Sequence, residues 1–397
     1  MIENREIKDA VPFKFSKKLK TILSIAALVG LVALLWGIFI EQAPASRIWA
    51  NIWLNGLLFR FLGLGALFFM AVNTLGESGW QTSIQRVLES MGQTIPFAAI
   101  LLLLAFPGFK DLFEWTHTGH LDEMLEAKSA YLNLPFWILR LIIYFAIWTL
   151  FAVRLRRLSV KNDLEPQENY LKRLRNTSGW FIVFFAVSSS MSAWDWLMSI
   201  DAHWFSTLYG WYTFSSMFVA SLAVVILITV GFKKYNILPN VNGEHLHDLG
   251  KYLFGFSIFW AYLWVSQFLL IWYGNIPEET VYFVQRVDHF HTLFFFNVVI
   301  NFGFPFLALM TRGSKRQPLY LSIVAVIVLA GHWLDLYLAI MPGAVGFEVA
   351  KIGVLEIGLP LLYLAIFLAI FFVSFGKAKA VPENHPYFKE SFSYENI

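Results

Sequence analysis

The sequence has no cysteine and unusually few charged residues. Of its 397 residues, 14% are Asp, Glu, Lys or Arg, whereas soluble globular domains carry about 25%. The missing cysteines exclude disulfide bonds, Cys-ligated zinc, iron–sulfur clusters and a covalently attached c-type haem in this chain. Because 58% of the residues are hydrophobic and 18% are aromatic, too few polar groups remain to cover a soluble core. The chain is therefore expected to be solvated by lipid.

The small net charge and the lack of widely spaced histidine pairs exclude further classes of function. The formal net charge is only +3, so we expect no nucleic-acid partner. A membrane cytochrome b with two stacked haems needs widely spaced histidine pairs on one helix, and the nine histidines form no such pair. The number of histidines alone does not exclude a single haem bound between His291 and His332. We expect no cofactor that is covalently bound or held by cysteine.

Ten apolar stretches are long enough to be membrane helices, because about 30 Å of hydrocarbon requires about 20 helical residues. The third stretch is short and begins beside Pro96, so we join it to the helical-looking segment after Trp80. The predicted fold class is an all-α integral membrane protein with ten transmembrane helices. The predicted spans are 19–40, 48–74, 90–106, 133–157, 176–200, 204–232, 250–274, 280–311, 317–341 and 351–376.

Lysine and arginine are distributed unevenly around these spans. Most of the 30 lie in segments that share one side of the membrane with the N-terminus. The positive-inside rule therefore predicts that both termini are cytoplasmic. No small-residue cleavage signal follows the first span, so we expect that span to remain as an anchor.

The spans are predicted to form two four-helix bundles plus flanking first and last helices. Spans five and nine end in related words, Trp194-Asp195-Trp196 and Trp333-Leu334-Asp335, which fits a repeat of four helices. The predicted divisions are a cytoplasmic N-terminal segment at 1–18, a membrane domain at 19–376 (flanking helix 19–40, bundle one 48–200, bundle two 204–341, flanking helix 351–376), and a cytoplasmic C-terminal tail at 377–397. The tail is expected either to lie against the protein or to stay mobile.

Ionisable side chains inside membrane spans are costly, and they usually face a bundle interior and mark a pathway or site. Counted from the span ends, the ionisable side chains of this chain fall in the outer half of the membrane. The turn between the fifth and sixth spans would cover them on the outer side. The candidates for proton transfer or for hydrogen bonding to a quinol are Asp195, Asp201, His203, Asp288, His289, His291, His332 and Asp335. A second tier consists of Arg60, Arg140 and Glu356.

Two carboxylate–imidazole pairs stand out among these candidates. Asp288 and His291 are three residues apart, as are His332 and Asp335, so each pair shares a helix face. A carboxylate beside an imidazole orients the ring and raises its basicity. Such pairs suit proton uptake, proton relay or a hydrogen bond to a quinone carbonyl. The alternative interpretation is that they are polar contacts that join helices.

Several long words in the sequence resemble one family. They are SAWDWLMSIDAHWFST at 192–207, HDLGK at 247–251, QFLLIWYGNIPEET at 267–280 and GHWLDLY at 331–337. In this order they resemble the F subunit of bacterial alternative complex III, which belongs with the polysulfide-reductase or NrfD-type membrane subunits. The ten-span layout extends the resemblance over most of the chain.

The resemblance implies a quinol:cytochrome c or quinol:oxidase electron-transfer complex in the bacterial inner membrane. The implied partners are a homologous ten-helix membrane subunit, an iron–sulfur and molybdopterin-like extracytoplasmic subunit, c-type cytochrome subunits and, in some complexes, a terminal oxidase. It implies a better quinol site in the sister subunit and proton conduction in this one. A quinone or quinol, of the menaquinone type or ubiquinone, is the implied ligand of the complex.

Two other function classes remain open at this stage. An ion-coupled secondary transporter would bind its coupling ion at intramembrane carboxylates, and it would favour a broken helix such as one near Pro305. A purely structural membrane anchor for redox partners would need no ionisable cluster.

Overall fold

The computed structural model describes residues 13–117 and 122–395, and every regular element in these residues is a helix. Ten helical segments are long and apolar enough to cross a membrane, so the predicted all-α membrane fold with ten spans is confirmed. Most of the predicted N-terminal segment 1–18 lies outside the described residues. The spans are α1 (Lys17–Phe39), α2 (Ala45–Leu75), a segment of three short helices (Trp80–Leu103), α7 (Leu134–Leu164), α8 with η4 (Tyr170–Ile200), α9 (Tyr209–Lys234), α10 (Gly243–Gly274), α11 with η5 and α12 (Pro277–Ala308), α14 (Pro318–Val345) and α15 (Val354–Phe375).

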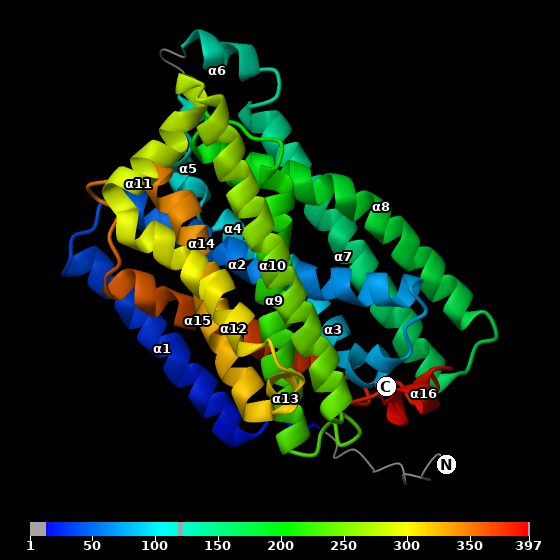
Figure 1. The fold of residues 1–397 in the computed structure, drawn as a ribbon. Coiled ribbons are helices and arrows are strands. Elements are labelled where there is room, and N and C mark those ends of the chain that lie inside the picture. The colour runs from blue at the N-terminus through cyan, green and yellow to red at the C-terminus, as the bar shows by residue number, and fades with distance from the viewer. Residues whose placement is uncertain (1–12, 118–121, 396–397) are drawn as a thin grey trace.

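Short helices complete or connect these spans. The third span is made of η1 (Trp80–Ile84), α3 (Gln85–Gly92) and α4 (Ile95–Leu103), so joining it to the segment after Trp80 is confirmed. The others are η2 (Phe106–Gly108), α5 (Phe109–Leu112), η3 (Glu114–Thr116), α6 (Glu123–Lys128), η4 (Met198–Ile200), the π-helix η5 (Val299–Gly303), α12 (Phe304–Ala308), α13 (Arg312–Arg316) and α16 (Phe388–Phe392). Figure 1 shows α6 at one end of the molecule, and the start of α1 and the C-terminal helix α16 at the other. We call these ends the α6 side and the terminal side.

Helix ends differ from the predicted ones where a helix continues in polar sequence. Helix α10 starts at Gly243, seven residues before the predicted start at 250, because Asn242 caps it. The Asn242 side chain accepts hydrogen bonds from the backbone N–H groups of Glu244 and His245, which would otherwise lack partners at a helix start. Helix α7 likewise runs beyond the predicted end at 157, through residues that contact a buried ionic cluster described below.

Helix α2 is the central element of the fold. It packs against α3, α4, α8, α9, α14 and α15, and most of its surface is buried. The approach to α9 is close: a Cβ on Gly65 would lie 2.6 Å from Ser221 Cβ, and the Ser221 hydroxyl donates to the carbonyl of Leu62. Small residues at such a crossing let the two backbones pack tightly, as is common in membrane bundles.

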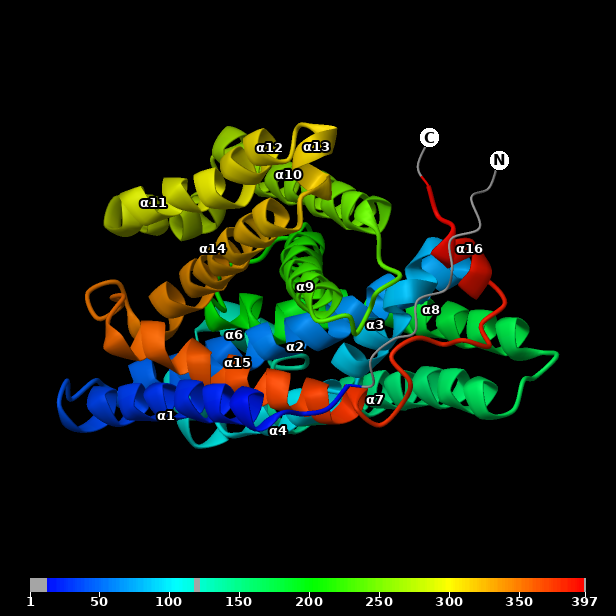
Figure 2. The ribbon, with the colours of Figure 1, turned by 90° about the horizontal axis from the view of Figure 1, so that it is seen from below.

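The remaining helices surround this centre, and the division into two bundles stays a prediction. Helix α8 packs on α2, α7 and α9, and α14 packs on α2, α9 and α11. Helix α1 lies at the periphery along α15 (Figure 2). Most of its surface is exposed and apolar, as expected of a helix in lipid.

The C-terminal tail packs on the terminal side. The Ser391 hydroxyl in α16 bonds to Ser83 Oγ at 2.7 Å and donates to the Trp80 carbonyl at 2.7 Å. The Asn242 side chain donates to the carbonyl of Tyr394 at 2.8 Å. The tail therefore links the third span to the start of α10, and of the two predicted alternatives it lies against the protein.

Candidate functional site

Two buried aspartates lie in α8 and α14, Asp195 at the end of α8 and Asp335 inside α14. Asp195 and Asp335 are 0% and 3% exposed, respectively. Each comes from one of the two related sequence words, and each lies in a span that runs toward the α6 side. The two carboxylates differ in their hydrogen-bond partners, and this difference separates their chemistry.

Asp195 forms an ion pair in which one arginine binds both carboxylate oxygens. Arg140 of α7 donates Nε to Oδ2 at 2.9 Å and Nη2 to Oδ1 at 2.8 Å. The Tyr144 hydroxyl adds a third bond at 3.2 Å, and the guanidinium lies over the Tyr131 ring, 4.0 Å from its centroid. A bidentate arginine–carboxylate pair is strong and geometrically specific. Removing either charge would leave the other one buried and unpaired.

Asp335 accepts hydrogen bonds from four neutral groups. The Tyr212 hydroxyl and the Asn297 amide donate to Oδ1, the latter at 2.9 Å. The Ser216 hydroxyl and the Trp260 indole donate to Oδ2 at 2.9 and 3.1 Å. Within the described residues, no lysine or arginine lies within 4 Å of this carboxylate. Asp335 is therefore solvated by dipoles from three neighbouring segments and not by a fixed cation.

His332 is connected to Asp335 through Ser216. The imidazole is fully buried, and its Nδ1 lies 3.0 Å from Ser216 Oγ and 3.9 Å from Asp335 Oδ2. Because the Ser216 hydroxyl donates its one proton to Asp335, it must accept from Nδ1–H of His332. His332 Nε2 has no partner within the described residues. The predicted pairing of His332 with Asp335 is therefore found, with a serine hydroxyl between the two groups.

An irregular helix supplies the amide that contacts Asp335. Asn297 accepts at its Oδ1 from the side chain of Asn301, at 2.7 Å, and Asn301 lies in the π-helix η5. A Cβ on Gly331 would lie 2.3 Å from Asn301 Oδ1, so only glycine at this position of α14 leaves room for that side chain. Single π-turns inside α-helices often occur at functional sites.

A small cavity adjoins Asp335 on the α6 side. The side chains that line it include Tyr212, Gln267, Arg286, Asn297 and Asp335. The volume of this cavity is about 30 Å³. This is enough for a water molecule, whereas a cavity that binds benzene measures about 150 Å³. The cavity therefore fits water beside the carboxylate and is too small for a quinone ring.

Arg286 and Asp201 form an ion pair at the α6 side of this cavity. Arg286 Nη2 donates to Asp201 Oδ2 at 2.7 Å, and Nε donates to the carbonyl of Leu338 at 2.9 Å. The guanidinium also lies over the ring of Tyr282. Asp201 is thus placed on the same side as the Asp335 cavity. Arg286, which was not among the predicted site residues, lies between the two carboxylates.

Two residues of the second tier have separate, local partners. Glu356 accepts from Arg47 in a bidentate pair, at 2.8 and 2.6 Å, and from Asn51 at 2.9 Å. These contacts join α15 to α2. Arg60 donates to Ser192 Oγ at 2.9 Å and lies beside the Trp196 ring, 5.0 Å from its centroid. Neither residue contacts Asp335 or His332.

Three predicted site residues do not face the interior. Asp288, His289 and His291 of α11 are exposed on the surface of the described structure. Phe290 has non-helical backbone angles (φ −124°, ψ 28°), and this kink breaks the regular three-residue spacing between Asp288 and His291. No hydrogen bond or ion pair joins these two side chains within the described residues. The expectation that they form an inward-facing carboxylate–imidazole pair is therefore wrong.

His203 also lies apart from the buried cluster. It is an exposed residue on the α6 side, where its Nε2 contacts Asp122 Oδ2 at 2.6 Å. The pKa of Asp122 is lowered by the backbone N–H of Leu125 and by this imidazole. His203 therefore attaches the start of α6 to the turn after η4. The predicted single cluster is in fact several sites: Asp335 with His332, Asp195 with Arg140, and Asp201 with Arg286 at the cavity beside Asp335.

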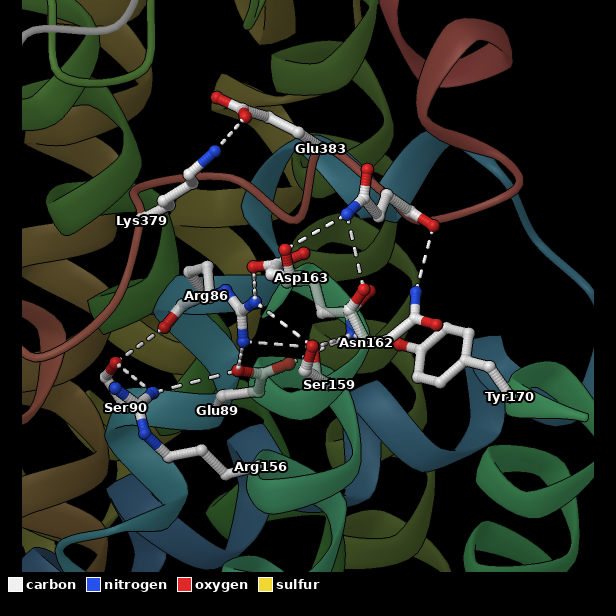
Figure 3. Close-up of polar contacts among 12 residues, drawn as sticks. Arg86, Glu89, Ser90, Arg156, Ser159, Asn162, Asp163, Tyr170, Lys379 and Glu383 are labelled. Atoms are coloured by element: carbon white, nitrogen blue, oxygen red, sulfur yellow. Dashed lines mark hydrogen bonds and ion pairs between the residues drawn. The ribbon is translucent and has the colours of Figure 1, made fainter. Parts of the chain in front are cut away.

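A second buried ionic cluster lies on the terminal side (Figure 3). Arg86 pairs with Glu89 at 2.6 Å and with Asp163, and Arg156 approaches Glu89 at 3.7 Å. Ser159 accepts from Arg86 at 3.0 Å. The cluster contains equal numbers of arginines and carboxylates, which suits a structural junction of α3 and α7.

The tail covers this cluster. Asn384 donates to the carbonyl of Asp163 at 3.0 Å, and Asn162 donates to the carbonyl of Asn384 at 2.9 Å. Arg86 is 1% exposed. Sequence reasoning missed the cluster because Arg86 and Asp163 are far apart in the chain.

Several residues of the Asp335 site carried only a weak sequence signal. They are Tyr212, Ser216, Trp260, Gln267, Arg286, Asn297 and Asn301. The four-residue spacing of Asn297 and Asn301 in an apolar span could have indicated one polar helix face. Tyrosine and tryptophan gave only a weak signal, since both are common at membrane interfaces.

No protein-family model matches the chain, and no curated protein matches it.

Proposed function

We propose that this chain is a haem-free membrane subunit of a quinol-oxidising respiratory complex of the alternative complex III type, and that it carries protons while partner subunits carry electrons. The long sequence words around Asp195, Asp201, His332 and Asp335 support the family. The absence of cysteine supports the division of labour, because no thiolate-bound redox centre can reside in this chain.

The observation that carries the proposal is the set of neutral donors around Asp335. A carboxylate held by a cation, as Asp195 is by Arg140, cannot take up a proton without leaving that cation buried and unpaired. Asp335 has no such cation among the described residues, and the hydroxyls of Tyr212 and Ser216 can rotate from donating to the carboxylate to accepting from the protonated acid. Of the two aspartates, Asp335 is therefore the one suited to bind and release a proton.

The contacts define a route for that proton. On the α6 side the cavity provides space for water between Arg286 and Asp335. Asp335, Ser216 and His332 form one hydrogen-bonded chain. In this chain Ser216 can give its hydroxyl proton to Asp335 while it takes the Nδ1 proton of His332, so that a proton moves from His332 toward Asp335 and the cavity. His332, in the interior of the bundle, is the inner end of the route. The route ends there among the described residues.

Quinol chemistry is proposed for a partner subunit. A quinol supplies two electrons and two protons on oxidation, but its ring does not fit the cavity beside Asp335. We therefore derive no step in which quinol binds in this cavity. The proposed partners are a homologous ten-helix membrane subunit, an extracytoplasmic iron–sulfur and molybdopterin-like subunit, c-type cytochromes and a terminal oxidase in some complexes. The proposed location is the bacterial inner membrane, with the terminal side in the cytoplasm.

The experiment compares quinol:acceptor turnover and proton release in complexes that contain wild-type chain or Asp335→Asn. Asparagine keeps the size and one of the two acceptor oxygens but cannot carry a proton. We expect normal assembly and a loss of proton release and turnover of about 10²-fold, as for removal of a general acid–base. A variant at an exposed residue, Glu390→Gln, is the control and should behave as wild type. Wild-type proton release in Asp335→Asn would refute the proposal.

An ion-coupled transporter is the second candidate, and one observation favours it. The eighth span is irregular at Phe290 and again in the π-helix η5, next to Pro305, and broken helices near a binding site are typical of secondary transporters. Ion or solute uptake by liposomes that contain only this chain would support this candidate. A purely structural anchor would instead tolerate neutralisation of Asp335 and His332 together.

A further inference from the structure

One face of α11 is polar in the middle of a membrane span. Gln285, Asp288 and His289 follow the spacing that places residues on one side of a helix, and Thr292 follows them beyond the kink at Phe290. All four side chains are exposed on the surface. We call this set the α11 polar face.

The α11 polar face is not a helix end that extends into water. Exposed apolar side chains lie on both sides of it along the helix: Val281 and Val284 toward the α6 side, and Phe296 and Val299 toward the terminal side. The second pair is 48% and 55% exposed, as expected for residues that contact lipid. The polar face is thus enclosed between two apolar bands at membrane depth.

In the described part of this chain the four side chains of the face remain exposed. The inner side of α11 packs through Tyr282, Phe294 and Asn297, and its neighbours are α10, α14 and η5. Figure 2 shows α11 at the edge of the molecule. His289 stacks on the Phe347 ring, with centroids 4.7 Å apart, and no hydrogen bond to the four side chains is formed by the described residues.

Hydrocarbon cannot satisfy these groups. Carboxylate and amide side chains within spans are expensive in lipid, and they almost always face protein or a water-filled space. Four hydrogen-bonding side chains on the outer surface of a span therefore require a covering partner at the same depth. A soluble domain would not reach between the two apolar bands.

We propose that the α11 polar face is a contact surface for a transmembrane helix of a different chain, which presents hydrogen-bonding side chains and a lysine or arginine opposite Asp288. The charge of the face selects this occupant. Asp288 lies on it, Glu278 and Glu279 lie at the start of the same helix, and Arg286 is turned inward to Asp201. A second copy related by a two-fold axis would bring the same acidic surface against itself. The inference needs only that α11 spans the membrane, so it does not depend on the proton-handling role.

A photo-crosslinking experiment tests the occupant. A benzophenone amino acid replaces His289 in the chain expressed in its native membranes, and matched variants carry it at Val284 and at Phe296 in the apolar bands. We expect position 289 to crosslink to a peptide from a membrane span of a different chain that contains Lys or Arg, and the band positions to give mainly lipid adducts. Lipid adducts alone at position 289, a crosslink to a second copy, or a crosslink to a soluble domain would each overturn the proposal.

An assembly experiment tests the polar groups themselves. The triple variant Gln285→Leu, Asp288→Leu, Thr292→Leu makes the face apolar, and Val281→Leu, Val284→Leu, Val299→Leu is the matched control. The readout is the fraction of tagged chain that migrates in a larger assembly on a native gel of mildly solubilised membranes. We expect the triple variant to lose at least about tenfold of the assembled fraction, with the control and the thermal unfolding of the isolated chain unchanged.

The outcomes separate this inference from the proposed function. Assembly at the wild-type level in the triple leucine variant, or a wild-type chain that migrates as a single copy, would overturn the contact surface. Loss of proton release with intact assembly, as expected for Asp335→Asn, concerns only the proton-handling role.

Discussion

At the scale of single residues, two aspartates in related sequence words have different chemistry because their donors differ. Arg140 binds both carboxylate oxygens of Asp195, whereas tyrosine, serine, tryptophan and asparagine side chains surround Asp335. The sequence indicated both carboxylates from their place in apolar spans. It could not indicate which one has an arginine, because Arg140 comes from another helix and its direction depends on packing.

The Asp195 pair gives a stability prediction. Arg140→Met should lower the free energy of unfolding by about 3–5 kcal/mol, because it leaves a buried carboxylate without its cation. The double variant Arg140→Met, Asp195→Leu removes both charges and should recover most of that loss. Thermal unfolding in detergent measures both variants. A double variant as unstable as the single one would show that the pair's charges are not the cause.

His332 and Ser216 give a second prediction at this scale. Ser216→Ala removes the hydroxyl between His332 Nδ1 and Asp335 Oδ2, which are 3.9 Å apart, while it leaves the carboxylate in place. We expect slower proton release with near-normal assembly, and partial recovery in Ser216→Thr, which restores the hydroxyl. Equal rates in Ser216→Ala and wild type would exclude the serine from the route.

At the scale of helices, apolar length predicted all ten spans, and local chemistry decided where they end. The start of α10 depended on the Asn242 cap, and the extension of α7 depended on contacts with Arg86 and the tail. The sequence also placed Asp288, His289 and His291 inside, since a span with ionisable groups usually turns them inward. These side chains instead face outward, because α11 is kinked at Phe290 and lies at the periphery. Neither feature can be predicted from hydropathy.

Helix η5 gives a prediction of its own. Gly331→Ala would place a Cβ within 2.3 Å of Asn301 Oδ1, so the Asn301 side chain must move. The hydrogen bond from Asn301 to Asn297 should be lost, and the contact of Asn297 with Asp335 should weaken. We expect lower proton release with little loss of unfolding stability, and Asn301→Ala in the same background should add no further loss. An additional large loss in the double variant would contradict this coupling.

The tail gives a pH-dependent prediction. Burial lowers the pKa of His385 to about 4 from its ordinary value of 6.5, and its ring packs edge-on to Tyr170. Between these two values the released tail binds a proton that the packed tail does not, so tail docking weakens as the pH falls from about 6.5 toward 4. The largest effect is about 3 kcal/mol. Limited proteolysis of residues 377–395 should speed up at the lower pH in wild type and depend less on pH in His385→Leu, where His245 still contacts the tail through Ser391.

At the scale of the whole molecule, the polar groups are divided among separate places with separate tasks. The Arg86 cluster and the tail hold the terminal side together, and the Glu356–Arg47 pair joins α15 to α2. The Asp335 site and its cavity lie near the α6 side, and the α11 polar face lies on the outer surface. Composition predicted a membrane protein without thiolate-bound centres. It predicted one cluster where the structure has several, because a count of residues along spans contains no rotation about the helix axes.

The most direct test of the central claim is whether Asp335 gains and loses a proton inside the membrane. The measurement is an infrared difference spectrum of the purified complex between mildly acidic and mildly alkaline pH, with isotope-labelled aspartate carboxyl groups to identify aspartate bands. The account predicts a labelled carboxylic acid band that changes with pH in wild type and is missing in Asp335→Asn. Identical difference spectra in the two proteins would contradict it.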